Sequence, residues 1–385
     1  MGFLKNKIKI IFLALSWFAI AGCSKSLLKI VSQNDDSPVT MFAETGERNF
    51  YSPVELSDSL LFLWENDVYG SFNNSSFLFF DSTIFVHDLG GRIHSFNIHT
   101  GKQTGVLKYK GAVYSTPLIF NYNIVIGLVE NNENRTDLIF YDFVNGKELK
   151  TVTIEGRLIN QMLKIDDDLV LITENGIVKR FTFRGNEVWS KDINSFIHSN
   201  PAYSNGNIYF GTDSGDLIKI DFETSNVIFR KNVGAAFNSG VTIKNNSAYI
   251  ADDDGKIYSI SLDDGSIQWE FETGAKIMMN PALDEENVYA GNLAGKIISL
   301  NRKNGTLNWY KDYQGMVFSS TPLITINRII ISNLFQSVIL IDKSNGEIKK
   351  EIELEARAKI TPAIRNNILF LGFDQGTVRA YEIIN

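Results

Sequence analysis

The chain has almost no cysteine, with a single Cys among 385 residues. One thiol excludes an intrachain disulfide, a Cys-rich zinc site and a redox centre of vicinal cysteines. Histidine is also scarce, at four residues, so acid–base catalysis has few candidates. Positive charge is in the minority, with 37 Lys and Arg against 44 Asp and Glu. This balance argues against a nucleic-acid-binding protein, which normally presents a basic face. The apolar share of 44% is still ample for a folded core.

The longest apolar run lies near the N-terminus, at residues 10–20 (IIFLALSWFAI), and follows three lysines. About eleven residues are too few for a membrane-spanning helix, which needs ~20, but they suit the apolar core of a secretory signal. The run ends in Ile20-Ala21-Gly22-Cys23, which resembles the lipobox of bacterial lipoproteins. That resemblance implies cleavage before Cys23 and its acylation, for example with palmitate. A plain secretory signal with a chance cysteine is the alternative.

The residues after the cysteine are polar and show no period (SQNDDSPVT, ETGERN). We therefore expect a signal peptide over residues 1–22, an acylated Cys23 with a flexible tether over residues 23–56, and a folded domain over residues 57–385. In lipoproteins, Asp directly after the cysteine retains the protein at the inner membrane, so Ser24 implies the outer membrane.

The rest of the chain repeats itself about every 40 residues. The marker is Ser-x-Pro at the head of a short apolar run, as in Ser199-Asn200-Pro201. Its third position recurs at intervals of 39 to 45 residues, at Phe77, Pro117, Met162, Pro201, Val241, Pro281, Pro322 and Pro362. Such regular spacing indicates a repeat architecture built of one supersecondary unit.

Each unit contains four short strand patterns separated by turns that hold Asn, Asp or Gly. Four strands per ~40 residues predict a β-propeller. The fourth strands fall at Trp64, Gly105, Lys150, Trp189, Phe229, Trp269, Trp309 and Lys350. Residues 60–70 form a fourth strand without the preceding three, and the last unit stops after three. These fragments complete one another, so the prediction is an all-β protein: an eight-bladed propeller of four-stranded antiparallel blades, closed by pairing of its N- and C-terminal strands. The large aromatic residues are expected to pack between blades.

The unit resembles the PQQ-like propeller repeat, with a D-x-x-G turn such as Asp252–Gly255, a turn such as Asn304-Gly305, and a following Trp such as Trp309. Two functional classes share this unit. Quinoprotein dehydrogenases hold pyrroloquinoline quinone over calcium, usually beside a vicinal disulfide that one Cys cannot form. Members of the outer-membrane protein assembly factor BamB family are lipoproteins. The resemblance to them covers residues 60–385 and includes the lipobox, the tether, eight blades and the closing segment 368–381 (ILFLGFDQGTVRAY).

The BamB resemblance implies a non-catalytic scaffold with no cofactor, no metal and no catalytic residue. It implies a monomer within a complex, held by its lipid at the outer membrane and facing the periplasm. The implied partner is the barrel-inserting subunit of the outer-membrane assembly complex, through its periplasmic domains. The alternatives are a propeller lipoprotein that serves another envelope complex or binds a ligand in its channel, and a PQQ-dependent dehydrogenase.

One face of the ring is the expected partner-binding face. In a four-stranded meander, the second–third turns and the blade-to-blade crossings emerge together. Departures from the repeat fall there, namely an insertion at Glu130–Asp137 and an apolar turn at Leu334-Phe335-Gln336. Exposed apolar groups on one face are costly unless a partner covers them. The candidates are Phe196, Ile197, Met278, Met316, Phe318, Leu334 and Phe335. The alternative is that several begin innermost strands and line the central channel.

In the resembled family the crossing between the third and fourth blades helps bind the partner, partly through an Arg. Phe196 occupies that crossing here, and the Arg is absent.

Two clusters invite a metal interpretation and do not support it. His87, His94 and His99 lie close in sequence, but residues five apart in a strand point to opposite faces, so we expect surface histidines. Asp252-Asp253-Asp254-Gly255 is acidic but lacks the ligand spacing of a calcium loop, so we expect a hairpin turn.

Overall fold

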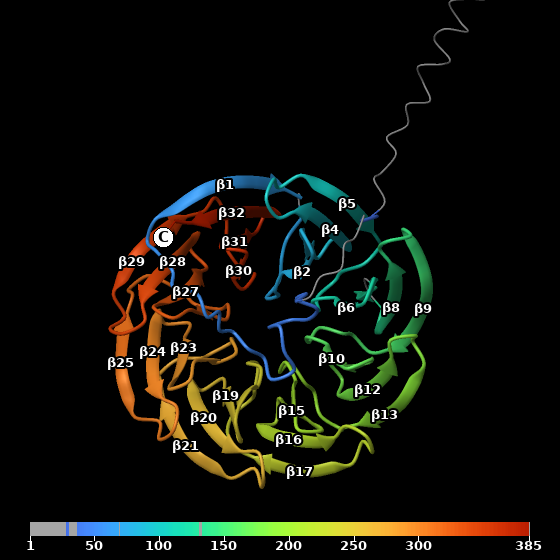
Figure 1. Ribbon diagram of the computed structural model, residues 1–385. Coiled ribbons are helices and arrows are strands. Elements are labelled where there is room, and N and C mark those ends of the chain that lie inside the picture. Colours follow the sequence, from blue (N-terminus) through green and yellow to red (C-terminus); the bar gives the residue numbers. More distant parts are fainter. Residues whose placement is uncertain (1–27, 31–36, 69, 131–132, 385) are drawn as a thin grey trace, which may run out of the picture.

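The computed structural model describes residues 28–30, 37–68, 70–130 and 133–384. These residues form 32 strands in eight antiparallel sheets of four strands each. The sheets are arranged as blades around a common centre (Figure 1). The predicted eight-bladed, all-β propeller is confirmed.

The blades are numbered here in chain order, and each runs from its innermost to its outermost strand. Blade 1 contains β2 (Leu78–Phe80), β3 (Thr83–His87), β4 (Arg92–Asn97) and β5 (Gln103–Lys108), and blade 2 contains β6 (Leu118–Phe120), β7 (Asn123–Val129), β8 (Arg135–Asp142) and β9 (Lys147–Glu155). Blade 3 contains β10 (Leu163–Ile165), β11 (Asp168–Ile172), β12 (Ile177–Thr182) and β13 (Glu187–Asp192), and blade 4 contains β14 (Ala202–Ser204), β15 (Asn207–Gly211), β16 (Asp216–Asp221) and β17 (Val227–Asn232). Blade 5 contains β18 (Thr242–Lys244), β19 (Ser247–Ala251), β20 (Lys256–Ser261) and β21 (Ile267–Glu272), and blade 6 contains β22 (Ala282–Leu283), β23 (Asn287–Gly291), β24 (Lys296–Asn301) and β25 (Leu307–Asp312). Blade 7 contains β26 (Leu323–Ile324), β27 (Arg328–Asn333), β28 (Ser337–Asp342) and β29 (Ile348–Glu353), and blade 8 contains β30 (Ala363–Arg365), β31 (Ile368–Phe373), β32 (Thr377–Ile383) and β1 (Leu60–Asp67).

The two ends of the chain close the ring as predicted. Strand β1 pairs antiparallel with β32, from Leu60 opposite Ile383 to Asp67 opposite Thr377. In Figure 1 the blue β1 lies outside the red strands of the same blade. Because the last blade needs both ends of the repeat, its four strands form only when the ring closes.

Outer-strand tryptophans join four of the blades to the next one along the chain. The indole nitrogen of Trp269 in blade 5 donates to the carbonyl oxygen of Arg302 in blade 6, at 3.0 Å. The same bond recurs from Trp64 to Ile98, from Trp189 to Phe222 and from Trp309 to Lys343. In blade 2, where the sequence has Lys150, the ammonium donates to the Gly185 carbonyl at 2.8 Å. The predicted interblade packing is confirmed.

The middle position of the Ser-x-Pro motif forms a second connection, around the central channel. In several blades the side chain at this position accepts a hydrogen bond from the main-chain N–H of the same position in the preceding blade. Gln161 accepts from Thr116 at 2.7 Å, Asn200 accepts from Gln161 at 3.0 Å, and Thr321 accepts from Asn280 at 3.2 Å. The side chains of the motif therefore form a polar inner ring. They accept hydrogen bonds from main-chain N–H groups that have no partner in a neighbouring strand.

Residues 37–56 differ from the expected tether, because they are packed. Figure 1 shows this blue segment crossing the centre of the ring. Its main chain bonds to innermost strands of several blades, with Gly46 accepting from Tyr203, Glu47 from Ile243 and Phe50 from Ile324. Phe42 and Phe50 are buried. We call residues 37–56 the strap. Each innermost strand has one edge without a strand partner. The strap bonds to several of these edges through its main chain, so its sequence needs no apolar period.

Arg48 is the buried centre of the strap. Its guanidinium donates to the carbonyl oxygens of Pro201 at 2.7 Å, Phe42 at 2.9 Å and Met162 at 3.0 Å. Burial lowers the pKa of Arg48 to about 9, so the group remains charged at neutral pH. Carbonyl dipoles from the strap and from blades 3 and 4 thus replace the water that a buried cation loses.

A shorter segment docks between blades 1 and 2. The N–H of Ile30 donates to the carbonyl of Phe143 at 2.8 Å, and the Tyr141 hydroxyl donates to the carbonyl of Leu28 at 2.9 Å. Leu28 is fully buried. The expected signal peptide and Cys23 lie outside the described residues. Over the described part of the chain, no helix has the length and apolarity to cross a membrane.

Candidate functional site

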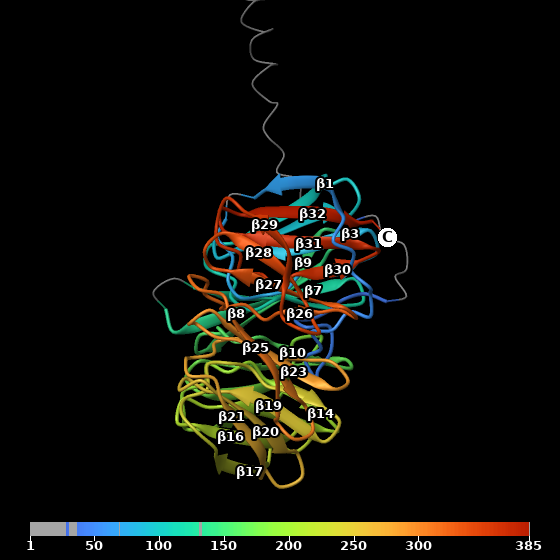
Figure 2. The ribbon, with the colours of Figure 1, turned by 90° about the vertical axis from the view of Figure 1, so that its left-hand side faces the viewer.

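The ring has two unlike faces. The second–third turns and the blade-to-blade crossings open on one, which we call the crossing face. The first–second and third–fourth turns open on the other, the turn face. The C-terminus marks the turn face in the side view of Figure 2, with the crossing face opposite. Ile30, bonded to Phe143 just after β8, also lies at the turn face.

The predicted partner-binding residues divide by burial. Phe196, Phe335 and Met278 are exposed on the crossing face, by 61%, 63% and 38% respectively. Leu334 and Met316 are half-buried. These five residues remain candidates for contact with a partner.

Ile197 and Phe318 do not lie on that surface. Both are fully buried. Ile197 packs among residues of blades 3 and 4, and the Phe318 ring meets Tyr313 edge to face at 6.0 Å between centroids. Their neighbours in the crossings point outward while they fill the gaps between blades. The alternative left open by the sequence was that such residues line the central channel. These two instead pack between neighbouring blades.

A polar cluster fixes the loop that carries Phe196. The N–H of Asp213 donates to the Phe196 carbonyl at 3.0 Å. The Asp213 carboxylate lies 2.8 Å from Nδ1 of His198, whose Nε2 is 3.4 Å from Glu174. Arg157 pairs with Glu174 at 3.0 Å. The sequence does not reveal this cluster, because its members come from the crossings and turns of two blades.

Two other second–third turns are held by internal hydrogen bonds and ion pairs. The Asp252 carboxylate accepts from the Lys256 N–H at 2.9 Å and from the Tyr258 hydroxyl at 2.8 Å, while Lys276 pairs with Asp253 at 2.6 Å. The predicted hairpin turn at Asp252–Gly255 is confirmed. In the longer β7–β8 hairpin, Arg135 pairs with Glu133 at 2.9 Å.

The prediction of surface histidines is wrong for two of the three in blade 1. His87 and His94 are buried, and only His99 is exposed. Nε2 of His94 lies 3.4 Å from the Asp88 carboxylate. The blade is covered on both sides by its neighbours, so strand residues that point either way become buried. Among the described residues, no cluster of His, Cys, Asp and Glu could hold a metal ion.

A cavity of about 250 Å³ opens on the crossing face at the mouth of the channel. Its lining includes seven amide residues: Asn73, Asn74, Asn160, Gln161, Asn200, Asn238 and Asn280. Met278 stands at its wall, and Phe42 of the strap closes its floor. The strap therefore makes the mouth a blind cavity. Asn200 and Asn280 both occupy the middle position of the Ser-x-Pro motif. This recurrence is the sequence signal that could have indicated an amide-lined cavity.

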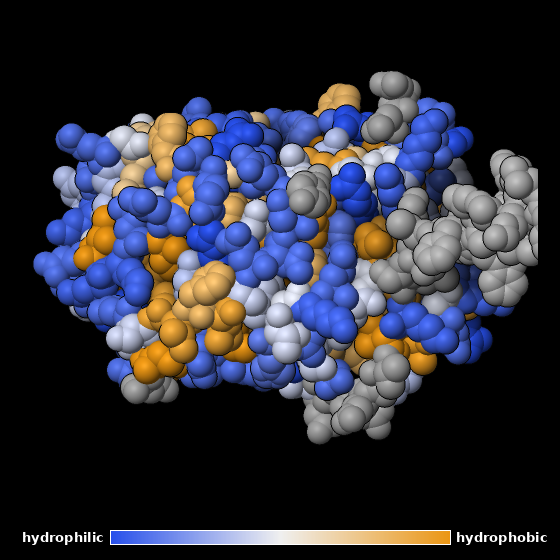
Figure 3. All heavy atoms as spheres, turned by 90° about the horizontal axis from the view of Figure 1, so that it is seen from above, coloured by the Kyte–Doolittle hydropathy of each residue, from blue (hydrophilic) through white to orange (hydrophobic). Residues whose placement is uncertain are grey.

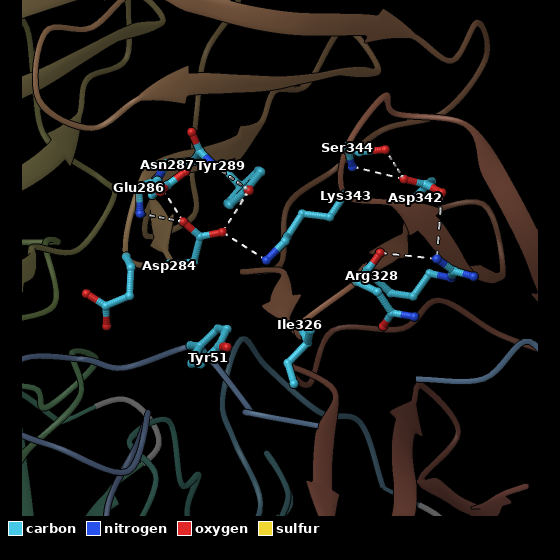
Figure 4. A pocket seen from close by; sticks show the side chains of 12 residues that line it. Tyr51, Asp284, Glu286, Asn287, Tyr289, Ile326, Arg328, Asp342, Lys343 and Ser344 are labelled. Atoms are coloured by element: carbon cyan, nitrogen blue, oxygen red, sulfur yellow. Dashed lines mark hydrogen bonds and ion pairs between the residues drawn. The ribbon is translucent and has the colours of Figure 1, made fainter. Parts of the chain in front are cut away.

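A wider cavity of about 600 Å³ opens on the turn face between blades 6 and 7 (Figure 4). Several of its charged groups bond to one another. The Asp284 carboxylate accepts from the Tyr289 hydroxyl at 2.9 Å and pairs with Lys343 at 3.0 Å. The Lys343 ammonium also lies 5.9 Å from the ring centre of Tyr51, a strap residue. This arrangement secures the strap to blades 6 and 7.

The rim of the ring presents apolar side chains in small groups among polar ones (Figure 3). They lie on outermost strands, for example the adjacent Leu61 and Phe62 of β1 and the adjacent Val227 and Ile228 of β17. Exposed apolar residues are usual at protein surfaces.

The fold and its repeat define the class of this protein: an eight-bladed PQQ-like β-propeller with a blind central channel. Residues 174–316 match the model of the family described as outer membrane protein assembly factor BamB. The structure is similar to BamB from Moraxella catarrhalis, with a TM-score of 0.71 at 15% identity, over 84% of this chain and 100% of that one. The family match and this likeness confirm the resemblance to the BamB family.

Other solved structures share the fold. A computationally designed protein, Ika8, matches with a TM-score of 0.72 at 13% identity, over 85% of this chain and all of its own. A europium-containing methanol dehydrogenase matches with a TM-score of 0.72 at 11% identity, over 90% of both chains. No curated protein sequence matches the chain. Since one fold here serves an assembly factor, a designed protein and a dehydrogenase, the fold alone does not decide function.

Proposed function

We propose that this protein is a non-catalytic scaffold lipoprotein of the outer-membrane β-barrel assembly machinery. In this proposal an acylated Cys23 holds it at the outer membrane, facing the periplasm. Its crossing face binds the periplasmic domains of the barrel-inserting subunit. The protein acts as a monomer within that complex.

The observation that carries the proposal is the BamB family match over residues 174–316. This stretch contains two of the three exposed apolar residues of the crossing face, Phe196 and Met278. Aromatic and Met side chains are enriched where proteins bind one another. A rigid ring that presents them at separate crossings suits a broad partner better than a small ligand.

The position of the N-terminal segment supports a crossing face that points into the periplasm. The described chain begins at Leu28, which is buried where blades 1 and 2 meet the turn face. A lipid anchor on the N-terminal side of Leu28 would hold the turn face toward the membrane. The crossing face would then point away from the membrane, toward periplasmic partners.

The dehydrogenase alternative requires a quinone and a calcium ion in the propeller, and the channel mouth does not fit them. Calcium prefers several oxygen ligands that include carboxylates. Of the described residues that line the mouth, none is Asp or Glu. The strap residue Phe42 also occupies the channel below. We therefore derive no chemical step at this site.

Affinity capture tests the partner. The tagged full-length protein, captured from detergent-solubilised envelopes of its own cells, is expected to recover the barrel-inserting subunit. Recovery should be lost with Phe196→Asp and kept with Ile228→Asp, an exposed rim residue. Reproducible capture of a different envelope complex, with no barrel-inserting subunit, would overturn the proposal in favour of the other lipoprotein class.

Metabolic labelling tests the anchor. Cells fed labelled palmitate should produce a labelled protein in the membrane fraction. Cys23→Ser should abolish the label and release the protein from the membrane. A labelled Cys23→Ser variant would contradict acylation at this residue.

A further inference from the structure

We propose that the blind channel mouth on the crossing face binds a short, extended, uncharged segment of polypeptide through its main-chain amides. The inference deepens the proposed function, since it gives the scaffold an extended client segment besides its folded partner. Phe196 and Phe335 do not line the mouth, and Met278 is the one candidate for partner contact that does. Substitution of Asn74 therefore tests the mouth separately from the proposed partner contacts.

Neutral amides converge at the channel mouth. Seven blade-to-blade crossings contribute residues to this cavity, and five of them supply Asn or Gln: for example, Asn74 comes from the crossing into blade 1, Asn160 from the crossing into blade 3, and Asn280 from the crossing into blade 6. An Asn side chain offers two N–H donors and one carbonyl acceptor. A peptide main chain offers the same two kinds of group, so the mouth and an extended segment are complementary.

The mouth also has hydrogen-bonding capacity that the protein leaves unused. The Asn74 amide donates one bond to Ser319 at 3.0 Å, and the Asn160 amide donates one to Ile197 at 2.8 Å. Among the described residues, neither side-chain carbonyl accepts a hydrogen bond. The carbonyl oxygen of Asn73 is also buried without a partner. Buried polar atoms in folded proteins normally have partners, so the unpaired Asn73 oxygen is unusual. Asn74 is exposed, and its carbonyl oxygen can accept from a ligand that brings N–H groups.

The described lining offers no available charge. No Lys, Arg, Asp or Glu belongs to the lining within the described part of the chain. His198 lies at the edge, and its ring is engaged by Asp213 at 2.8 Å. A phosphate, a carboxylate or a metal ion would therefore meet no compensating charge. A neutral chain of amides needs none.

The wall and the size of the mouth limit what part of a segment enters. Met278 adapts its shape to different neighbours, which suits a ligand whose side chains vary. The volume of about 250 Å³ is below the ~300–1,000 Å³ of typical small-molecule sites, so only a short stretch of the segment enters and the rest lies across the crossing face. Phe42 closes the far end, and its carbonyl accepts from Arg48 at 2.9 Å. A segment can thus be held at the mouth but cannot pass through the ring.

Fluorescence anisotropy tests the proposal with the purified full-length protein in detergent. The probe is a dye-labelled, end-blocked peptide of alternating Ser and Val. We expect saturable binding that weakens at least tenfold in Asn74→Leu, which keeps the shape and removes the amide. Met278→Trp, which narrows the mouth, should weaken binding as well. Asn308→Leu, at an exposed position of β25, should bind as the unaltered protein does. Thermal melts verify that every variant is folded.

Three outcomes would overturn the inference: no saturable binding of the peptide, an equal loss in Asn74→Leu and Asn308→Leu, or saturation by maltohexaose but not by the peptide. The last result would assign the mouth to sugars. Capture of the barrel-inserting subunit separates this inference from the proposed function. If capture succeeds and the peptide does not bind, only the inference fails. If the peptide binds and capture fails, only the scaffold proposal fails.

Discussion

The guanidinium of Arg48 donates a hydrogen bond of 2.7 Å to the carbonyl oxygen of Pro201, 153 positions further along the chain. Pro201 ends the Ser-x-Pro motif of blade 4, so this bond connects the strap to the repeat. Through it, a segment that precedes the propeller becomes part of its core. The channel of this ring is closed by its own chain.

Replacing Arg48 should release the strap. Arg48→Met leaves the carbonyls of Phe42, Met162 and Pro201 without their donor, and we expect a loss of about 2–4 kcal/mol in the free energy of unfolding. Urea denaturation measures this loss. A Glu-specific protease should cut after Glu44 and Glu47 at least tenfold faster. Arg357→Met, at an exposed position, is the control, and equal protease resistance of both variants would contradict a structural role for the strap.

The contact between Trp269 and Gly305 predicts coupled substitutions. A Cβ on Gly305 would lie 2.7 Å from Cδ2 of Trp269, at a φ of +70°. Gly305→Ala should therefore cost about 1–3 kcal/mol from overpacking, besides the cost of the positive φ. Trp269→Ala alone should cost about 3–5 kcal/mol.

In the Trp269→Ala background, Gly305→Ala should cost less, because the clash is gone. Gly315→Ala, at a φ of +83° with nothing within 4 Å, measures the strain of the positive φ alone. A double-mutant cycle by urea denaturation checks the coupling. Strict additivity would mean that the ring and the glycine do not limit each other.

Burial of His87 predicts a stability loss in mild acid. Burial lowers the pKa of His87 to about 4, although the Asp88 carboxylate opposes that shift. The unfolded chain, with a pKa near 6.5, binds the proton first. Stability should therefore be full above about pH 6.5 and fall by up to about 3 kcal/mol as the pH drops toward 4.

Urea denaturation at a series of pH values measures the slope. His87→Gln, which does not titrate, should flatten the slope between pH 6.5 and 4, whatever its effect on stability at pH 7. His99→Gln, at an exposed position, should leave the slope unchanged. An unaltered slope in His87→Gln would assign the acid sensitivity to other groups.

Phe335 should contribute to partner binding without contributing to stability. Its side chain is exposed by 63% at the tip of the β27–β28 turn. Phe335→Asp, alone and with Leu334→Asp, is expected to reduce capture of the barrel-inserting subunit at least tenfold. The thermal melt should change by less than about 2 °C, because surface substitutions usually cost under ~0.5 kcal/mol. A lowered melting temperature with normal capture would show that this turn is packing rather than a binding surface.

Much of the fold could be predicted because its determinants are local and periodic. The spacing of Pro201, Pro281 and Pro322 gives the repeat, and Trp189, Trp269 and Trp309 mark the outer strands. The site was predictable only in part. Phe196 and Phe335 lie on the expected face, but Ile197 and Phe318 turn inward. Adjacent residues in a crossing alternate between surface and core, and no period in the sequence records which is which.

The sequence by itself determined the eight four-stranded blades, the closure of β1 on β32 and the interblade tryptophans, since each follows from spacing and residue type. Only the tertiary structure decided what fills the centre. Residues 37–56 are polar and aperiodic, and a charged residue such as Arg48 is costly to bury alone. The ring offsets that cost with carbonyls from Met162 and Pro201, which no local pattern connects to residue 48. The packing of the strap across the centre also makes the channel a blind cavity lined by amides.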